Sequence, residues 1–267
     1  KIGIILGQLG TPNAPTAKAL KPYLKEFLGD PRVIEKNRAL WWVILNFIIL
    51  KIRPKRSAKL YKRIWTEEGS PLLVYTKKQT ELLREKFKDL SDIVEIEYGM
   101  RYGRDSIAEA SQKLIDKGCS KILLFNIMCT ETTRAMEKGL EIKPEEVIHT
   151  FQSRFGKDPW LVPYTDEKIN ELAESGVKKI AVFCPGFTTD CLETLDEIGN
   201  EAREDFIERG GESLELIPCL NDHPVWIEAM EEIIRDEIYS WVKTANNNKN
   251  FNCKIKCPVA TEKAKCL

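Results

Sequence analysis

Histidine is scarce in this chain, and the common nucleotide-binding motifs are missing. Only two histidines occur among 267 residues, His149 and His223, so no Ser-His-Asp triad stands out. No Gly-x-Gly-x-x-Gly loop and no Gly-x-x-x-x-Gly-Lys-Ser/Thr loop occurs, which leaves nucleotide binding without support. Lysine plus arginine and aspartate plus glutamate each number 41, so no excess charge favours nucleic acid as a partner.

Long hydrophobic runs are missing as well. The longest, ALWWVILNFIIL at residues 39–50, is shorter than the stretch of about 20 residues that spans a bilayer. Two interpretations of this run remain open, a buried helix and a segment at a membrane interface or pocket mouth. The second rests on its adjacent tryptophans and on the basic residues that follow, Lys51, Arg53, Lys55 and Arg56.

The eight cysteines are scattered and do not suggest a disulfide framework. Several lie in or beside apolar runs, where a free cysteine behaves as a small hydrophobic residue. We therefore expect free thiols in a reducing compartment. No secretory segment precedes the first strand-like residues, so the expected location is cytoplasmic, with a peripheral membrane contact through residues 39–50.

Apolar runs of strand length alternate with helical patterns along the chain. Strands are expected at 2–10, 94–103, 121–126, 147–156, 178–187 and 212–222. Helices are expected between and after them, at 17–30, 106–118, 132–141, 166–176 and 223–244, with a carboxylate-rich helix that begins near Asp190. Strands that alternate with helices of this length predict βαβ units, and hence an α/β fold with mostly parallel sheets.

A weak internal repeat suggests two similar α/β halves. LIDKGCSKILLFN (114–126) and LAESGVKKIAVFC (172–184) share a helix end, a glycine, a basic residue and an apolar strand. Chance is an alternative explanation, because glycine commonly ends helices. The predicted division is 1–127 for the N-terminal half, 128–243 for the C-terminal half and 244–267 for a flexible tail rich in asparagine, lysine and cysteine.

The stretch PGFTTDCLETLDEI (185–198) places three carboxylates on one predicted helix face, from Asp190, Glu193 and Glu197. One interpretation is a helix start, with Asp190 and Glu193 as a variant of the capping box. The other is a site for a cation, since stacked carboxylates repel one another in its absence. The residues alone leave both interpretations open.

Six blocks of sequence together resemble the ferrochelatase family, which inserts Fe(II) into a porphyrin in heme biosynthesis. They occur in order and cover most of residues 1–235. The blocks are GQLGTPNAPT, FLGDPRVI, RPKRSAKLYKRIWTEEGSPLL, TFQSRFGKDPWLVPYTDE, CPGFTTDCLETLDEI and IPCLNDHPVW. The resemblance implies a lyase with two Rossmann-like halves of the chelatase fold around a porphyrin cleft.

The resemblance also implies roles for individual residues. Glu193 matches the carboxylate that binds the metal and removes pyrrole protons, and Glu197 matches part of an acidic path for ions or protons. Leu9, Arg53, Tyr61 and Ser70 match porphyrin contacts, and residues 39–50 match an apolar lip. Porphyrin (protoporphyrin IX or coproporphyrin III) and ferrous iron are then the substrates. An arginine at the rim suits porphyrin propionates, because its guanidinium holds a carboxylate with two hydrogen bonds.

The chain departs from the family after KILLFN (121–126). Family members continue with a Pro- and Tyr-containing loop, further helices and strands, and a Ser-x-His-x-Leu-Pro motif that carries the catalytic histidine. Here IMCTETTRAM follows directly, and its TTRAM matches a later helix. We therefore expect an internal deletion that removes the catalytic histidine and shortens each sheet. Neither His149 nor His223 matches its position.

One structural consequence follows from this departure. Shortened sheets expose edges and apolar faces, so reduced stability or oligomerisation is expected.

Some ferrochelatases bind a [2Fe–2S] cluster through C-terminal cysteines. Cys253, Cys257 and Cys266 lack a fourth ligand and the expected close spacing, so a cluster is not expected.

Alternatives to an active ferrochelatase remain open at this point. The first is a non-catalytic derivative that binds porphyrin or metal without inserting it. Others are a cobalt or nickel chelatase of the same fold and a deletion product without stable activity. The apolar lip and the DCLETLDEI block argue against the cobalt or nickel chelatase.

Overall fold

The computed structural model describes four stretches of the chain, residues 1–34, 36–126, 148–152 and 161–246. Within them the first sheet has three parallel strands in the order β2-β1-β3. Ile4 of β1 lies opposite Ile96 of β2 and Leu123 of β3. The strands are β1 (Ile2–Thr11), β2 (Val94–Gly103) and β3 (Lys121–Asn126), which confirms three of the predicted strands.

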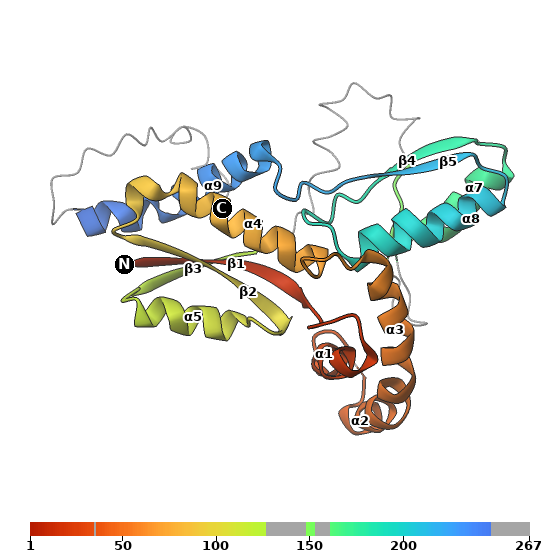
Figure 1. Ribbon diagram of the computed structural model, residues 1–267, viewed down its shortest axis with the longest axis horizontal. Helices are drawn as coiled ribbons and strands as arrows, with labels where there is room; N and C mark the ends of the chain where they lie inside the picture. The colour runs from red at the N-terminus through yellow and green to blue at the C-terminus, as the bar shows by residue number, and fades with distance from the viewer. Residues whose placement is uncertain (35, 127–147, 153–160, 247–267) are drawn as a thin grey trace.

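Helices cover both faces of this sheet (Figure 1). On one face, Ile2, Ile4 and Leu6 pack against α4 (Pro71–Lys86) and α9 (Pro224–Asn246). On the other, Ile5 packs against α5 (Ile107–Asp116). The short 3-10 helix η2 (Lys88–Leu90) follows α4 on the first face, where Leu90 joins the core around Ile2 and Ile4. Alternate residues of a strand point to opposite faces, so a strand covered on both sides is apolar throughout. This explains the nearly unbroken apolar run of β1.

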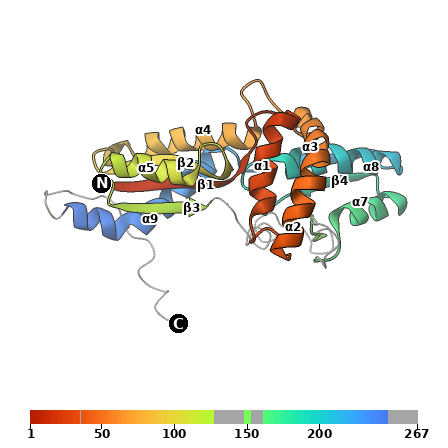
Figure 2. The same ribbon diagram turned by 90° about the horizontal axis from the view of Figure 1, so that it is seen from below.

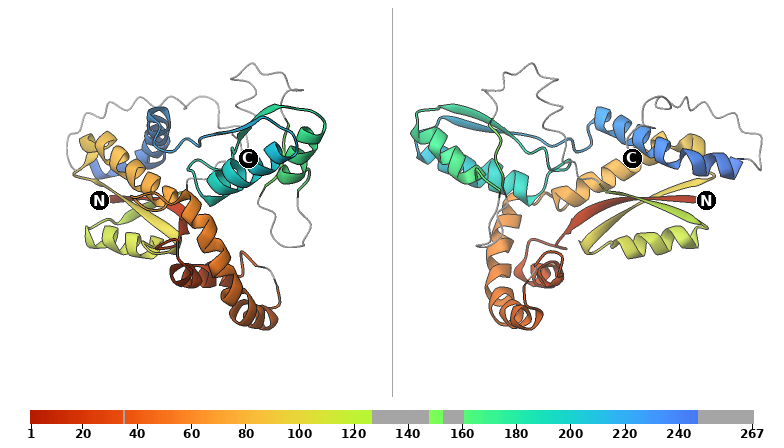
Figure 3. Two further views of the ribbon diagram at one scale, coloured as in Figure 1. Left: turned by 45° about the vertical axis from the view of Figure 1, so that its right-hand side comes forward. Right: turned by 180° about the vertical axis from the view of Figure 1, so that it is seen from behind.

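The second sheet has two parallel strands among the described residues, β4 (Lys179–Phe183) and β5 (Ser213–Ile217). Three helical segments pack against it, around Ile198, Phe206 and Leu214. They are α7 (Thr165–Glu174), the π-helix η4 (Glu193–Ala202) and α8 (Arg203–Glu208). Figure 3 shows this group beside the first sheet. The α/β architecture with parallel sheets is therefore confirmed.

A separate helical unit lies next to the carboxyl end of β1 (Figure 2). It consists of α1 (Ala17–Gly29), α2 (Arg38–Ile44), the π-helix η1 (Leu45–Ile49) and α3 (Leu50–Ile64). The apolar run 39–50 divides between two environments here. Leu45 and Leu50 pack into the core of the unit, whereas six neighbours expose large apolar side chains: Leu40, Trp42, Val43, Phe47, Ile48 and Ile52.

Three predicted segments differ from the structure or lie outside the residues that it describes. Of the strand predicted at 147–156, only Phe151 forms a bridge, with Tyr164, and 153–160 lie outside the described residues. The predicted helix at 132–141 and the tail from 247 also lie outside them.

The last helix, α9, returns to the first sheet. The division into halves at 127 and 128 stays a prediction.

No helix in the described part of the chain is both long and apolar enough to cross a bilayer. This agrees with the short apolar runs in the sequence.

Candidate functional site

The carboxyl end of β1 opens into the space between the two sheets, the usual ligand position in open α/β folds. Residues 8–11 form this end, the Gln-Leu-Gly-Thr of the first sequence block. Gly10 has a φ of +117°, and a Cβ there would lie 2.0 Å from the carbonyl oxygen of Tyr102. Only glycine permits this close approach of β1 and β2, which sets the course of the chain into the site.

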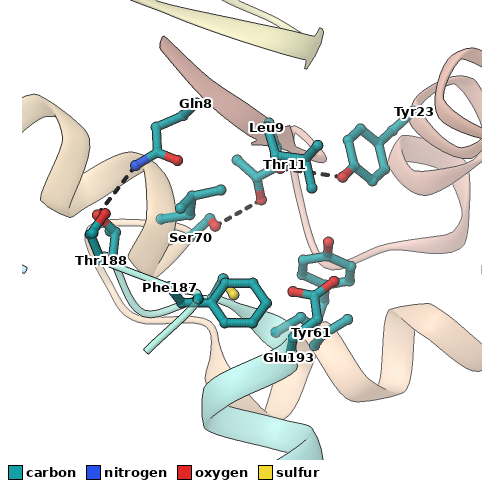
Figure 4. Close-up of a pocket in the computed structure, with 15 residues that line it drawn as sticks. Gln8, Leu9, Thr11, Tyr23, Tyr61, Ser70, Phe187, Thr188 and Glu193 are labelled. Atoms are coloured by element: carbon teal, nitrogen blue, oxygen red, sulfur yellow. Dashed lines mark hydrogen bonds between the residues drawn. The ribbon is translucent and has the colours of Figure 1, made fainter. Parts of the chain in front are cut away.

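A pocket lies at this point, with walls from distant parts of the chain (Figure 4). Its volume is about 60 Å³ within the described residues. That is room for about two water molecules, so a larger ligand has to extend beyond these walls. The lining residues are Gln8, Leu9, Gly10, Thr11, Tyr23, Tyr61, Ser70, Leu72, Gly186, Phe187, Thr188, Thr189, Cys191, Leu192 and Glu193.

Hydrogen bonds hold the walls in place. The Thr11 hydroxyl donates to the Ser70 hydroxyl at 2.7 Å, which ties the end of β1 to the start of α4. The Tyr23 hydroxyl donates to the carbonyl oxygen of Gly10 at 3.2 Å (Figure 4). Across the pocket, Gln8 Nε2 donates to Thr189 Oγ1 at 3.2 Å, which joins β1 to the loop that follows β4.

Glu193 is the one carboxylate among the lining residues that the structure describes. Burial, together with the charge of Glu193, raises the pKa of the Tyr23 and Tyr61 phenols. The same two causes raise the pKa of the Cys191 thiol. These three groups therefore stay neutral at pH 7. The pocket combines a single carboxylate with neutral hydroxyl and thiol groups and the apolar side chains of Leu9, Leu72, Phe187 and Leu192.

The helix that carries Glu193 differs from the predicted α-helix. Residues Glu193–Ala202 form a π-helix with Leu192 at its N-cap, and no side chain caps it. Of the two interpretations left open by the sequence, the capping box of Asp190 and Glu193 is therefore wrong. Asp190 is buried before the helix, where its carboxylate accepts hydrogen bonds from Thr194 and Asn221. A π-helix inside or beside an α-helix is often found at a functional site.

A family model described as Ferrochelatase matches residues 1–129 and 125–238 of this chain. The chain belongs to the ferrochelatase family. The ferrochelatase of Cronobacter sakazakii is 38% identical, over 88% of this chain and 98% of its own length. Those of Idiomarina loihiensis and Teredinibacter turnerae are 36% and 35% identical, over 90% of this chain and 89% and 88% of theirs.

Membership of the ferrochelatase family confirms the predicted enzyme class, a lyase of heme biosynthesis. The fold agrees with it, because the parallel sheets β2-β1-β3 and β4-β5 are consistent with a chelatase fold. The relatives that we compared are all named ferrochelatases, so the alternative of a cobalt or nickel chelatase gains no support from them.

The structure brings four of the six predicted ferrochelatase site residues into one pocket. Leu9, Tyr61, Ser70 and Glu193 all line it, although β1, α3, the start of α4 and η4 are far apart in the sequence. Arg53 and Glu197 are not among the lining residues. Arg53 lies earlier on α3 with an exposed side chain, and Glu197 is a half-buried residue one turn beyond Glu193 on η4.

Several lining residues were not predicted as site residues. Phe187 and Thr189 lie in the loop CPGFTTD, whose position after a predicted strand was a signal that it borders the site. Tyr23 lies inside α1, a helix that carries no chemical motif, and only the packing of α1 beside β1 brings it to the pocket. No local signal in the sequence identifies it.

Neither histidine belongs to this ferrochelatase pocket as the structure describes it. His223 is exposed at the start of α9, where its Nδ1 accepts a hydrogen bond from the backbone N–H of Val225 at 3.3 Å. His149 is also exposed. Among the described residues no group of three or more His, Cys, Asp and Glu side chains could hold a metal. Cys253, Cys257 and Cys266 lie outside those residues.

Proposed function

We propose that this ferrochelatase binds a porphyrin against the pocket between β1, α3, α4 and η4, and that Glu193 meets the Fe(II) substrate there. One observation carries the proposal. Leu9, Tyr61, Ser70 and Glu193 were singled out from three sequence blocks that lie far apart in the chain, and they line a single pocket. Leu9 is 40% exposed, which leaves an apolar side chain open to the face of a flat ligand.

The chemistry of metal insertion suits the groups of this pocket. Insertion breaks two pyrrole N–H bonds and forms four bonds from nitrogen to iron, so two protons have to leave the macrocycle. The Glu193 carboxylate accepts these protons in turn, and Glu197, one turn along η4, passes them towards solvent. Carboxylate oxygens are also suitable ligands for an Fe(II) ion that approaches along the same face.

We assign Arg53 to the edge of the porphyrin that carries the propionates. It lies on the same helix as Tyr61, with its side chain exposed on the stretch that leads to the apolar run 39–50. A guanidinium at this position pairs with a propionate, while the ring lies over Leu9. Which porphyrin is bound depends on the number of propionates that the rim accepts.

We further propose that the chain lacks the family's catalytic histidine because an internal segment is absent near residue 127. Three observations support this. The two matches to the family model meet at residues 125–129. The alignments with relatives extend over 316 and 324 positions, more than the 267 residues of this chain. Both histidines of the chain lie outside the described pocket lining.

The second candidate function follows from that proposal. Without an imidazole in the pocket, a protein of this family binds porphyrin and metal but inserts the metal slowly or not at all. The pocket keeps the carboxylate of Glu193 and the apolar wall, which are the parts needed for binding. Insertion then depends on whether Glu193 alone supplies the base.

One experiment distinguishes the two functions. Protein, Fe(II) or Zn(II), and protoporphyrin or coproporphyrin are mixed without oxygen, and the Soret band is followed. Insertion that Glu193→Gln slows by about 100-fold, while porphyrin binding is kept, supports ferrochelatase activity through Glu193. Glu201→Gln, on the same π-helix but outside the pocket lining, is the matched control and should insert at the wild-type rate.

Two other results have clear meanings in this experiment. Porphyrin binding without insertion by the wild-type protein identifies the non-catalytic binder. A protein that binds neither porphyrin contradicts the proposed function altogether.

We also propose that the exposed apolar side chains of α2, η1 and α3 contact a membrane surface, through which a porphyrin enters or heme leaves. Trp42, Phe47 and Ile48 are each more than half exposed there. Lys51, Lys55 and Arg56 follow on the same helical stretch with exposed side chains. Apolar groups beside cations are typical of a peripheral contact with anionic lipid. A cytoplasmic location stays a prediction.

A further inference from the structure

Asp190 is a buried carboxylate that accepts hydrogen bonds from three donors. It is 4% exposed and stands three residues before Glu193. The Thr194 hydroxyl donates to its Oδ1 at 2.9 Å, and the backbone N–H of Cys219 donates to the same oxygen at 3.4 Å. Its Oδ2 accepts from Asn221 Nδ2 at 2.7 Å. A buried carboxylate oxygen that lost these donors would be left unsatisfied, so the contacts hold the side chain in place.

The contact between Asp190 and Asn221 is reciprocal. While Asn221 Nδ2 donates to the carboxylate, Asn221 Oδ1 accepts from the backbone N–H of Asp190 at 2.9 Å. Asn221 has a φ of +46°, a left-handed conformation that asparagine and aspartate adopt more readily than other side chains. Both partners are buried, so each hydrogen bond has little competition from water.

These contacts shape the turn from which Glu193 projects. Thr194 Oγ1 accepts from the backbone N–H of Cys191 at 3.0 Å and donates to Asp190, so the turn closes on itself. The N-cap of η4 has no side-chain hydrogen bond of its own. The contacts of Asp190 thus stand in place of a cap at the start of the π-helix.

The same network reaches the first sheet and its helices. Gln79 of α4 donates through Nε2 to the carbonyl oxygen of Asn221 at 2.6 Å and to Thr189 Oγ1 at 3.2 Å. Gln8 of β1 donates to that same Thr189 oxygen. The turn before Glu193 is therefore anchored to the opposite wall of the pocket.

We propose that Asp190 is a positioning residue, which through its reciprocal contact with Asn221 sets the direction in which Glu193 enters the pocket. The inference rests on the proposed function of Glu193. It goes beyond that function because Asp190 does not line the pocket and reaches the metal side only through the turn. A displacement of about 1 Å in a reacting group lowers rates by as much as about 100-fold.

A reciprocal exchange tests this inference. In Asp190→Asn the new N–H₂ group points at another donor. That donor is the Asn221 amide in one orientation, and the Thr194 hydroxyl and Cys219 N–H in the other. In Asn221→Asp two carboxylates face each other. The double variant restores the pair, since an amide at position 190 donates to a carboxylate at 221 while its carbonyl oxygen still accepts from Thr194 and Cys219. The charge and volume of the pair are also kept.

We expect Asp190→Asn and Asn221→Asp each to lower kcat for zinc insertion by about 10- to 100-fold, with the KM for porphyrin changed less than twofold. The double variant should return kcat to within threefold of the wild type. In a Glu193→Gln background, Asp190→Asn should have no further effect on kcat, because the two residues act as a unit. Asp30→Asn, a buried carboxylate remote from the pocket, is the control and should lower the melting temperature without this change in kcat.

A second readout does not depend on activity. Cys191 lies in the same turn and lines the pocket, so its alkylation rate, followed by peptide mass spectrometry in the folded protein, reports the geometry there. We expect faster alkylation in either single variant and the wild-type rate in the double variant. If the variants show this alkylation pattern but the wild type inserts no metal, the positioning role of Asp190 and Asn221 stands and the proposed function is rejected.

Two outcomes would overturn the inference itself. One is a folded double variant that recovers neither kcat nor the protection of Cys191. The other is a set of folded single variants with wild-type kcat and wild-type Cys191 alkylation. If a single variant does not fold, Thr194→Val, which removes one donor to Asp190, takes its place with the same expected fall in kcat.

Discussion

Arg63 of α3 and Asp196 of η4 form an ion pair between the two helices, with 3.1 Å between Arg63 Nε and Asp196 Oδ1. The Asp196 side chain is 2% exposed, whereas that of Arg63 is 35% exposed. Arg63 also binds Glu204 at 2.7 Å. Tyr61 lies two residues before Arg63, and Glu193 lies three before Asp196. The pair therefore holds together the two helices that carry the walls of the site.

Replacement of Arg63 should weaken both the fold and the site. Arg63→Met keeps the aliphatic stem but leaves Asp196 buried without its cation. We expect the free energy of unfolding to fall by about 2 kcal/mol, less than for a fully buried pair because Arg63 is partly exposed. Porphyrin affinity, measured by fluorescence quenching, should fall with it. Lys62→Met on the same helix is the control, and wild-type stability and affinity in Arg63→Met would contradict the prediction.

Buried thiols should make the protein less stable in alkali. Burial, and next the charge of Asp190, raises the pKa of Cys184 to about 12, and the same causes raise the pKa of Cys219. An unfolded cysteine has a pKa of about 8.5, so above that pH the unfolded state releases protons that the folded state retains. Stability is then complete below about pH 8.5 and falls as the pH rises towards the folded pKa.

Cys184→Ser tests this alkaline loss and keeps the hydrogen bond that Cys184 donates to Gln152. Between pH 8.5 and pH 10 one such thiol costs about 2 kcal/mol of stability. We expect the serine variant to lose about that much less than the wild type, as measured by urea unfolding at both pH values. Equal losses in the two proteins would show that Cys184 does not retain its proton.

The exposed apolar side chains of α2 and η1 should bind anionic vesicles. The rings of Trp42 and Phe47 lie edge to face with their centroids 6.0 Å apart, and both are more than half exposed. We expect Trp42→Ser together with Phe47→Ser to lower vesicle binding by at least about tenfold, since each aromatic ring contributes about 2 kcal/mol when buried in lipid. The melting temperature should not change. Binding is measured by cosedimentation with phosphatidylglycerol vesicles.

The control for this prediction is Ile207→Ser, an exposed apolar residue on α8. It should leave vesicle binding unchanged. Binding should also weaken as salt is added, because Lys51, Lys55 and Arg56 are exposed cations that salt screens. Vesicle binding that depends on neither ring would contradict a membrane contact through α2 and η1.

The open sheets should limit the stability of the monomer. The described part of the second sheet has two strands, and exposed apolar residues occur on edge strands in both sheets, Leu124 on β3 and Ile217 on β5. Two-stranded sheets are marginal, and apolar edges favour association. We expect either a melting temperature below about 45 °C or an oligomer in light scattering. A pure monomer that melts cooperatively between about 45 and 65 °C would contradict this expectation.

Most of the fold follows from local patterns in the sequence. The strands of the first sheet were predicted almost to the residue, because β1 is covered on both faces and is apolar at nearly every position. The α5 helix was also predicted, at 106–118, and in the structure Ser106 and Glu109 form a capping box at its start. The return of α9 to the first sheet was not predictable in this way, because an amphipathic helix does not specify which sheet its apolar face will cover.

The functional site, too, could be predicted from the sequence only in part. The resemblance of the sequence blocks to ferrochelatases singled out Leu9, Tyr61, Ser70 and Glu193, because each stands inside a block that matches the family. Tyr23 was missed, and the contacts of Asp190 were not foreseen in either interpretation of its stretch, because both residues act through partners far away in the chain. Local pattern in the sequence determined the secondary structure, and the resemblance of its blocks to ferrochelatases indicated the enzyme family and the candidate carboxylate. Only the tertiary structure decided which side chains share the pocket and what holds Glu193 there, because long-range packing and hydrogen bonds leave no local pattern.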